Sequence, residues 1–435
     1  GPMGLWTHDG IGLAAQADPC KRAYPRNVKI IGGALALLLA AGSPSQAGLP
    51  DAAWTSAFPI PLPGLPAAPP APSVPAFAAI PSVPVVKFKG LSIKGVQFSR
   101  NDRIPVSLVA AIDRTEKTLL LAIYDLRLSE VADAILRAKA RGVDVRLVYD
   151  QGHTRPATPG AGSGPSAEYQ ALVAAGVPTR LLNGGGSYGI MHHKYAVFDG
   201  ELLMTGSFNW TRAADTKNFE NAVFKTDPAL IDGFVRNWTW MWAFGRAPGA
   251  AADRPAGAGL GAPPADPLKP VAFAGGKYPR YVFSPQGGVE DLLVDAIGRS
   301  KRTVDVLIFS FYAQRVADAL IAAKARGVVV RVVGDISQTR RSPAMLSLSN
   351  AGVGLRLSSG RDGTGAMHHK YALVDGAFLM SGSYNFSQNA ELYNFENDLL
   401  TTAPGEVAAF GGEFAAVWAQ ARAAEPADLP APKSL

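Results

Sequence analysis

The sequence predicts an α/β protein made of two tandem α/β/α halves related by a pseudo-two-fold axis, with one functional site at their interface. The first observation is an internal duplication, in which Val131-Ala-Asp-Ala matches Val316-Ala-Asp-Ala. The second is that each copy alternates helical segments with continuous apolar runs of strand length, the pattern of a sheet buried on both faces by helices. The third is that both copies contain one polar motif, Met191-His-His-Lys and Met367-His-His-Lys.

Composition is typical of a soluble globular protein and narrows the choice of partners only slightly. The 435 residues are enough for two domains, and 48% of them are hydrophobic and 18% charged. The single cysteine, Cys20, excludes an internal disulfide framework and a multi-cysteine zinc site. The net charge of +7 falls to +3 for residues 95–435, because residues 1–94 hold seven Lys/Arg and three Asp. The body is therefore mildly basic, which is compatible with a polyanion but does not identify one.

The N-terminal 47 residues are expected to be a targeting segment. Gly1-Pro2 before Met3 is typical of a protease-cleavage scar. A basic run, an apolar stretch at 30–42 and a small-residue end at Ala47 then follow in the order of a secretory signal. The apolar stretch of 13 residues is shorter than the roughly 20 that a spanning helix needs. We therefore expect export to the periplasm or the medium, with a membrane anchor as the alternative.

Composition also predicts where the folded parts begin and end. Proline and alanine crowd the stretch that follows the signal, which predicts an extended tether, and a Gly/Ala/Pro-rich stretch predicts a linker between the copies. The predicted segments are 1–47 scar and signal, 48–93 tether, 94–246 first domain, 247–276 linker, 277–425 second domain and 426–435 tail.

Within each copy the elements can be placed in order. Matches run at an offset of 185 as far as Asp150 and Asp335, and at 176 from Ala175 and Ala351 onward, so the first copy has nine extra residues, assigned to the loop 156–165. In the first copy we expect helices at 104–114, 129–141, 167–175 and 229–244, and strands at 118–124, 143–149 and 178–182. The motif itself predicts a strand pair, 192–198 and 202–205, joined at Asp199-Gly.

The two motifs share a longer pattern of polar residues. Each reads His-x-Lys, four residues, Asp, six residues, Gly-Ser-x-Asn, and then Asn-Phe-Glu-Asn, with 28 positions from the first His to the Glu. The matched residues are His192, Lys194, Asp199, Ser207, Asn209 and Glu220, and His368, Lys370, Asp375, Ser383, Asn385 and Glu396. This pattern resembles the HKD signature of the phospholipase D superfamily over residues 95–425. It is most similar to the nuclease branch, which includes small bacterial endonucleases and mitochondrial phospholipase D-like proteins.

The resemblance implies two tandem phospholipase D-like domains that act together as a phosphodiesterase. Members of the nuclease branch carry one motif per chain and work as homodimers, whereas this chain carries both motifs, so a monomer is sufficient for a complete site. The scheme requires neither a metal nor another cofactor, and the sequence offers no clear metal-binding cluster.

The chemistry of a phosphodiester explains the residue types. Its negative charge repels nucleophiles, so Lys194 and Lys370 are expected to neutralise it. Asn209 and Asn385 would donate amide hydrogens, and Ser207 and Ser383 would add hydroxyls. One of His192 and His368 would form a covalent phosphohistidine, while the other protonates the leaving oxygen and then deprotonates water.

The carboxylates are expected to support the residues that contact the phosphate rather than to contact it themselves. Glu220 and Glu396 would each hold the second nitrogen of a catalytic histidine. By the family pattern, Asp199 and Asp375 are supports rather than groups that touch the phosphate. Sequence alone does not fix which histidine attacks.

Other polar residues near the motifs have weaker assignments. His193 and His369 would point to the opposite face of the strand, as packing or supporting residues. His153 matches Gln338, which argues against a shared catalytic role. Arg155 and Arg340 match across the copies and are candidates for contact with the substrate backbone, with ordinary solvated arginines as the alternative.

The substrate is the part of the prediction that the sequence supports least. The leading hypothesis is a nuclease that cleaves DNA or RNA, based on Asn-x-Glu-Asn, the mild basicity and the pair Arg155 and Arg340. The alternative is a phospholipase D or phosphatidyltransferase that acts on membrane phospholipids, which export and the apolar 238–244 region favour. A non-catalytic binding module is the third possibility, and two complete motifs argue against it.

Overall fold

The computed structural model describes residues 82–156, 164–186, 188–250, 261–267 and 269–431. The predicted signal at 1–47, with its apolar stretch at 30–42, and the tether as far as residue 81 lie outside these ranges. The predicted membrane anchor is corrected here, because in the part of the chain that the structure describes no helix has the length and hydropathy needed to cross a membrane.

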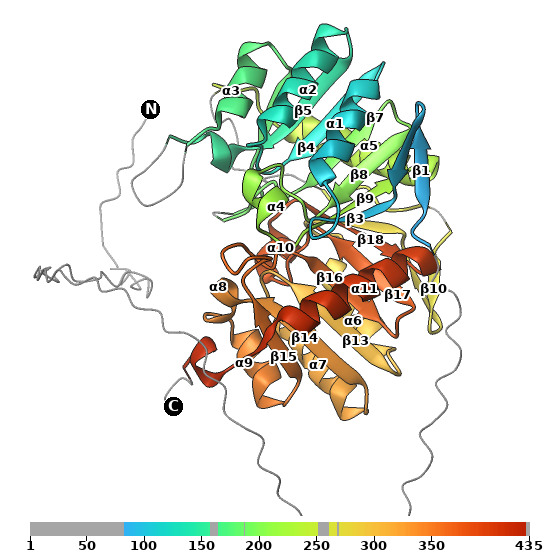
Figure 1. The fold of residues 1–435 in the computed structure, drawn as a ribbon, viewed down its shortest axis with the longest axis vertical. Coiled ribbons are helices and arrows are strands. Elements are labelled where there is room, and N and C mark those ends of the chain that lie inside the picture. The colour runs from blue at the N-terminus through green and yellow to red at the C-terminus, as the bar shows by residue number, and fades with distance from the viewer. Residues whose placement is uncertain (1–81, 157–163, 187, 251–260, 268, 432–435) are drawn as a thin grey trace, which may run out of the picture. The chain divides into compact units, whose positions relative to one another are not determined.

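The first half is a mixed sheet with helices on both faces (Figure 1). The strand order is β3-β9-β8-β7-β4-β5-β6, in which β4, β5 and β6 are parallel to one another and β7 is antiparallel to β4. The strands are β3 (Val96–Phe98), β4 (Thr118–Ile123), β5 (Asp144–Asp150), β6 (Thr179–Leu182), β7 (Lys194–Phe198), β8 (Leu202–Gly206) and β9 (Asn221–Lys225). The helices are α1 (Ile104–Arg114), α2 (Ser129–Ala140), α3 (Ala167–Ala174), α4 (Arg212–Thr216) and α5 (Pro228–Phe244), with a 3₁₀ turn at Gln151–Thr154.

The second half repeats this arrangement with one added edge strand. Its order is β12-β18-β17-β16-β13-β14-β15-β19. The strands are β12 (Tyr281–Ser284), β13 (Thr303–Ile308), β14 (Val329–Asp335), β15 (Gly354–Ser358), β16 (Lys370–Val374), β17 (Phe378–Gly382), β18 (Glu396–Thr401) and β19 (Arg422–Ala423). The helices are α6 (Val289–Gly298), α7 (Gln314–Ala325), α8 (Ile336–Thr339), α9 (Pro343–Asn350), α10 (Gln388–Leu392) and α11 (Pro404–Gln420), with a 3₁₀ turn at Pro426–Asp428. The α/β prediction and the duplication are confirmed.

Continuous apolar strands produce this layering because successive side chains point to opposite faces. In β7, Ala196 and Phe198 pack with α1, α2 and α3, which lie next to one another in Figure 1, whereas Tyr195 and Val197 pack on the other face with α5. Two further hairpins were not predicted, β1–β2 (Val85–Phe88, Leu91–Lys94) and β10–β11 (Val271–Phe273, Gly276–Tyr278). They lie at matching places in the duplication, inside stretches that composition had assigned to the tether and the linker.

The two halves share one core rather than merely touching. Helix α5 packs against the second half, where the rings of Phe234 and Phe283 are 5.1 Å apart, and α11 packs against the first, where Phe98 and Phe410 are 5.1 Å apart. Trp240, which lies off the apolar stripe of α5, packs on Phe395 of the second half at 5.5 Å. Burial of these aromatic rings fixes the relative placement of the halves, on which a shared site depends.

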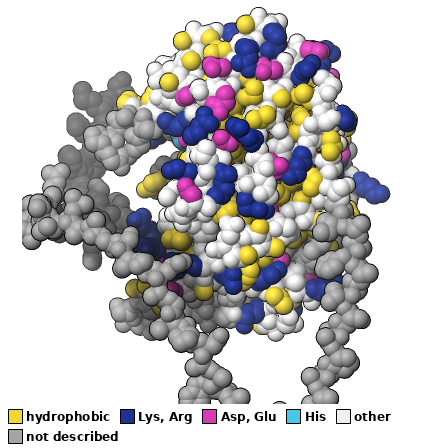
Figure 2. Space-filling view, in the orientation of Figure 1, with side chains coloured by type: hydrophobic (Ala, Val, Ile, Leu, Met, Phe, Trp, Pro, Cys, Tyr) yellow, Lys and Arg dark blue, Asp and Glu magenta, His cyan; other side chains and the backbone are white. Residues whose placement is uncertain are grey.

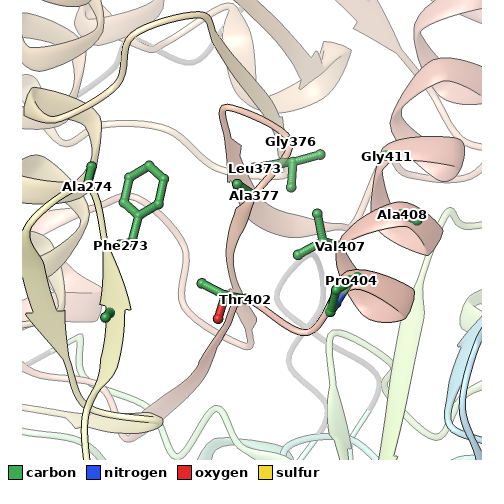
Figure 3. Close-up of a pocket in the computed structure, with 11 residues that line it drawn as sticks. Phe273, Ala274, Leu373, Gly376, Ala377, Thr402, Pro404, Val407, Ala408 and Gly411 are labelled. Carbon is green, nitrogen blue, oxygen red and sulfur yellow. The ribbon is translucent and has the colours of Figure 1, made fainter. Parts of the chain in front are cut away.

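Strand register brings the motif residues to one edge of each sheet. Lys194 at the start of β7 is opposite Ile123 at the end of β4, and Ile123 is opposite Tyr149 near the end of β5. The loops after β4, β5 and β6 therefore begin where the motif begins. An apolar pocket of about 620 Å³ lies elsewhere, at the opposite end of β16. Gly376 lines it, and Figure 3 shows Phe273 and Val407 around it, so it is not the site of the motif residues.

Candidate active site

The first histidine of each motif is paired with a glutamate from the other half. His192 Nδ1 lies 2.8 Å from Glu396 Oε2, and His368 Nδ1 lies 2.8 Å from Glu220 Oε1. Both glutamates are fully buried, and the two histidine residues are 5% and 7% exposed. A carboxylate only accepts, so it keeps hydrogen on Nδ1 and leaves the Nε2 lone pair for chemistry. The predicted pairing of Glu with His is thus present in the geometry, and it runs across the interface.

Backbone contacts hold this crossed arrangement in place. His192 N–H donates to Phe395 O at 3.0 Å, and His368 N–H donates to Phe219 O at 3.1 Å. Each donor lies two residues before a motif strand, and each acceptor immediately precedes the glutamate that the histidine binds. The main chain of one half therefore sets the position of the histidine of the other.

The motif serines support the glutamates. Ser207 Oγ donates to Glu220 Oε2 at 2.6 Å, and Ser383 Oγ donates to Glu396 Oε2 at 2.7 Å. A second donor comes from the asparagine two residues before each glutamate, Asn218 Nδ2 at 3.1 Å and Asn394 Nδ2 at 3.0 Å. The serine hydrogens are thus used within the protein, which corrects the expectation that these hydroxyls face the phosphate.

The two lysines are buried beside the histidines. Lys194 Nζ donates to the carbonyl of His192 at 2.5 Å, and Lys370 Nζ donates to the carbonyl of His368 at 2.7 Å. Burial lowers the pKa of Lys194 to about 7 and that of Lys370 to about 8, although Glu396 and Glu220 act in the opposite direction. Each amine also lies about 5 Å from an aromatic ring, Tyr124 for Lys194 and Phe309 for Lys370.

Burial also keeps both histidines neutral near neutral pH. It lowers the pKa of His192 well below the ordinary value, helped by the charges of Lys194 and Lys370, and it lowers the pKa of His368 to about 4. The glutamates differ, because burial raises the pKa of Glu396, whereas His368 and Lys370 outweigh burial and lower that of Glu220. A neutral imidazole with a free Nε2 is suited to nucleophilic attack.

The motif asparagines lie at the same edge and are half-buried. Asn385 Oδ1 accepts from Ser310 N–H at 3.3 Å, so its amide hydrogens remain for a ligand. Asn209 Oδ1 is buried without a hydrogen-bond partner among the described residues. Both placements agree with the expected role of donating to a phosphate.

The motif aspartates are not part of the site. Asp199 and Asp375 sit in hairpin turns at the opposite ends of β7 and β16, with φ of 52° and 54°. Asp199 accepts three backbone N–H groups at 2.7–2.9 Å, from residues 116–118, and Asp375 accepts from the equivalent residues 301–303. Five strand residues, roughly 20 Å, separate each aspartate from its histidine pair. Their inclusion among the catalytic residues is corrected to a role in fixing the turn.

The arginine candidates lie near the site edge but contact none of the motif residues in the hydrogen bonds and ion pairs of the described chain. Arg155 follows the 3₁₀ turn after β5, and Arg340 follows α8 after β14, and both are exposed. Their positions are consistent with substrate contact and equally with solvated side chains.

Sequence reasoning missed several residues that complete the site. The second histidine of each motif is fully buried, and its ring contacts an asparagine of the other half. Asn397 Nδ2 lies 2.8 Å from His193 Nδ1, and Asn221 Nδ2 lies 3.0 Å from His369 Nδ1. These asparagines end the Asn-Phe-Glu-Asn segments, so the matched motif contained the signal. His153 is the other omission, because its ring packs on Tyr124, which packs on His192.

Comparison with known proteins agrees with this geometry. The family described as "Cardiolipin synthase, PLD-like domain" matches residues 108–242 and 293–418. A mitochondrial cardiolipin hydrolase of Chlamydomonas reinhardtii is 32% identical over 143 residues, covering 32% of this chain and 58% of that protein. A phospholipase D of Rickettsia conorii is 29% identical over 127 residues, covering 29% of this chain and 58% of that protein. The chain thus spans about three-fifths of the length of these relatives.

A solved structure extends the likeness to both halves. Phosphatidylserine synthase of Haemophilus influenzae shares the fold with a TM-score of 0.59 at 14% identity, covering 76% of this chain and 87% of that one. The two family matches coincide with the two halves that build the crossed site. The chain therefore belongs to this cardiolipin synthase, PLD-like family.

Proposed function

We propose that this protein cleaves phosphodiester bonds of phospholipids through a covalent phosphohistidine. Nε2 of one of His192 and His368 attacks phosphorus, and the other, in its protonated form, gives its proton to the departing oxygen. That second histidine, now neutral, takes a proton from water, whose oxygen displaces the first histidine from phosphorus. The products are a phosphomonoester and an alcohol, and both histidines return to their starting states.

The remaining residues of the site support this cycle. Lys194 and Lys370 neutralise the phosphate oxygens, and Asn209 and Asn385 donate to them. Glu396 and Glu220 hold the imidazoles by Nδ1 and stabilise whichever histidine is protonated. A bound phosphate anion favours the protonated form of a histidine, which offsets the burial that holds the free imidazoles neutral.

The observation that carries the choice of a lipid is an exposed aromatic rim on one side of the site. It consists of Tyr188, Tyr312, Leu392 and Tyr393, which are 82%, 37%, 42% and 40% exposed. Tyr393 immediately precedes Asn394, which binds Glu396, and its carbonyl accepts from Gly185 N–H at 2.6 Å. Asn389 Nδ2 donates to Tyr188 O at 3.0 Å, which joins the loop before His192 to α10.

The rim is present on one side only. The pseudo-symmetric equivalents of Tyr188, Tyr312, Leu392 and Tyr393 are Thr364, Arg127, Thr216 and Lys217. Tyrosine and leucine at an exposed edge suit the boundary between lipid headgroups and acyl chains, where an amphipathic ring keeps its hydroxyl in water. The names of the relatives, cardiolipin hydrolase and phospholipase D, support the same substrate class.

A nuclease is the second candidate. Arg155 and Arg340 are exposed near the site edge, where they are able to reach a nucleic-acid backbone. On the face drawn in Figure 2, however, Lys and Arg side chains are interspersed with Asp and Glu rather than gathered in one basic track. The aromatic rim also permits base stacking, so the test below includes nucleic acid.

The test offers the full-length protein four substrates in parallel, in the presence of EDTA. These are phosphatidylglycerol vesicles, plasmid DNA, a single-stranded oligonucleotide and soluble bis(4-nitrophenyl) phosphate. We expect turnover of lipid and of the soluble diester. We also expect the double substitution Tyr188→Ser and Tyr393→Lys to lower vesicle turnover by about tenfold, because it removes interfacial side chains, with little effect on the soluble diester.

The matched control changes the other side of the site. Thr364→Ser alters the position equivalent to Tyr188 and should leave vesicle turnover unchanged. Cleavage of nucleic acid with intact vesicles would replace the lipid proposal by the nuclease, and Arg155→Ala with Arg340→Ala would then be expected to weaken activity.

A further inference from the structure

A polar group borders His192 and has no equivalent beside His368. It consists of Tyr124, Asp125 and His153, and the second half has Phe309, Ser310 and Gln338 at the matching positions. Both sets lie in the loops after the strands that precede the site, β4 and β5 in the first half and β13 and β14 in the second. The surroundings of the two catalytic histidines are therefore unequal, because the tyrosine, carboxylate and imidazole beside His192 are replaced by Phe, Ser and Gln beside His368.

Tyr124 connects this group to the catalytic histidine. Its ring stands edge to face against His192, with centroids 4.8 Å apart, and against His153, with centroids 4.3 Å apart. The side chains of His153 and Asp125 are 19% and 18% exposed, so both are accessible to a small ligand. His153 thus lies one aromatic ring away from the reacting imidazole.

Asp125 is paired with Arg127, whose Nε donates to Asp125 Oδ1 at 2.9 Å, and its other oxygen faces His153 without a direct hydrogen bond. His153 Nε2 lies 3.7 Å from Asp125 Oδ2, and His153 Nδ1 lies 3.9 Å from Asp150 Oδ1, both beyond a direct hydrogen bond. Asp150 is fully buried. In the described part of the chain, neither its Oδ2 nor His153 Nδ1, which is also buried, has a hydrogen-bond partner. The equivalent oxygen of Asp335 accepts from Met367 N–H at 3.0 Å. The first half therefore keeps unused polar capacity where the second half does not.

The chemistry of these atoms favours a hydroxyl group as the ligand. A hydroxyl both donates and accepts, so a single one inserted near His153 and Asp125 is able to accept from the imidazole and donate to the carboxylate. Within the described ranges no group of three or more His, Cys, Asp or Glu side chains is placed to hold a metal ion, so the carboxylates are not explained as a metal site.

We propose that Asp125 and His153 form a headgroup subsite that selects phosphodiesters whose polar alcohol carries a free hydroxyl. This inference rests on the proposed lipid activity, and it orients the substrate: the hydroxyl-bearing headgroup lies beside Tyr124, Asp125 and His153.

The test compares two lipids that differ in headgroup hydroxyls, phosphatidylglycerol and phosphatidylmethanol, in vesicles of otherwise identical composition. The variants His153→Gln and Asp125→Ser install the residue types of the second half. For each we expect kcat/KM for phosphatidylglycerol to fall about tenfold more than kcat/KM for phosphatidylmethanol, because only the former loses hydroxyl partners. Gln338→Ala, at the position equivalent to His153, should leave the ratio of the two values unchanged.

The outcomes separate this inference from the proposed function. Turnover of neither lipid by the unaltered protein would remove the lipid activity itself. Turnover of both lipids with the same ratio in the unaltered protein and in His153→Gln would overturn the subsite alone. Thermal unfolding of each variant shows whether it is folded, and Tyr124→Phe, which installs the residue type of the second half and retains the ring, tests the same side if Asp125→Ser does not fold.

Discussion

The two halves of this molecule agree in the residues that face the phosphate and differ in the residues around them. His192 and His368 have the same partners at nearly the same distances. Their surroundings differ, because Tyr124 and His153 lie beside His192, whereas Phe309 and Gln338 stand at the equivalent positions beside His368. A reaction with a nucleophile and a proton donor needs two similar groups in different roles. The comparison teaches that duplication supplies the pair and that divergence around it makes the two members unequal.

The buried second histidines show the same divergence. His369 Nε2 lies 3.3 Å from Glu413, which is also paired with Arg100 at 3.0 Å. At the position equivalent to Glu413 the first half has Asn237, whose Oδ1 accepts from Tyr195 Oη at 3.0 Å. Burial without an acidic partner at that position lowers the pKa of His193 to about 3. His193 therefore stays neutral, whereas the ring of His369 faces the carboxylate of Glu413.

A buried carboxyl adds a third difference. Asp398 follows Glu396 by two residues on β18, and Ala222 is its equivalent in β9. Burial raises the pKa of Asp398 well above the ordinary value, and the charge of Glu396 acts in the same direction. The second half therefore holds an extra neutral carboxyl beneath its motif.

The largest expected effect tests whether the halves are parts of one site. His192→Ala or His368→Ala alone should lower kcat by at least about 10³-fold, because each removes either the nucleophile or the proton donor. The double variant should be little worse than either single one, since residues that act as a unit are not additive. Turnover of bis(4-nitrophenyl) phosphate measures this. Retention of about half the activity in either single variant would indicate two independent sites.

The next effect tests the crossing of the glutamates. Glu396→Gln and Glu220→Gln should each lower kcat by about 10²-fold or more, because an amide in place of the carboxylate does not fix the histidine tautomer or stabilise its protonated form. Steady-state kinetics of the folded variants measure this effect. Glu413→Gln is the control, since its carboxylate holds the buried His369 and should affect stability more than kcat. Full activity of Glu396→Gln would contradict the crossed pairing.

The pH dependence follows from the buried lysines. Only the charged amine neutralises the phosphate, so kcat/KM should fall as pH rises through about 7 to 8, where Lys194 and Lys370 lose their protons. If His368 is the nucleophile, kcat/KM should also fall as pH drops through about 4, because protonation takes up the Nε2 lone pair that attacks phosphorus.

The stability contribution of the same lysines has the opposite sign. Their folded pKa values lie below the ordinary 10.5, so between about pH 8 and 10 the unfolded chain binds more protons. Their contribution to the free energy of unfolding therefore rises with pH in this window. Rate profiles and urea titrations across it measure the two trends, and activity that rises from pH 7 to 9 would contradict the role of the charged lysines.

The smallest expected effect on activity concerns the motif aspartates. Asp199→Ala and Asp375→Ala should lower the free energy of unfolding by about 2–4 kcal/mol, because each leaves three backbone N–H groups without their acceptor. The kcat of the folded fraction should stay close to that of the unaltered protein. Asp199→Asn keeps an oxygen acceptor and tolerates the positive φ, so it should cost less. A fall of kcat by 10²-fold in a fully folded Asp199→Ala protein would place this residue back in the chemistry.

Much of this arrangement was predictable, because duplication and period-2 patterning act locally. They predicted the alternating elements and the orientation of His193 toward the opposite face of the motif strand. The crossed pairing was not predictable, since the 28 positions from His to Glu are the same whether Glu220 binds its own His192 or the other half's His368. Only the packing of α5 and α11 decides between them.

The roles of the motif serines and aspartates were also beyond the sequence. Hydroxyls and carboxylates at fixed spacing are compatible with substrate contact or with internal hydrogen bonds, and Ser207 makes the latter. Asp199-Gly was recognised as a turn, and the family pattern made Asp199 a support, but neither showed what it supports. The length of β7, which separates Asp199 from His192 by roughly 20 Å, restricts its support to the turn.

The number of covalent intermediates per chain tests the central claim most directly. The protein is mixed with excess bis(4-nitrophenyl) phosphate, quenched in alkaline denaturant within the first turnover, and analysed by mass spectrometry of the peptides that contain His192 and His368. One shared site predicts at most one phosphohistidine per chain, on one of these two residues, with a burst of one nitrophenolate. Two phosphohistidines on one chain, or a label on neither residue, would contradict it.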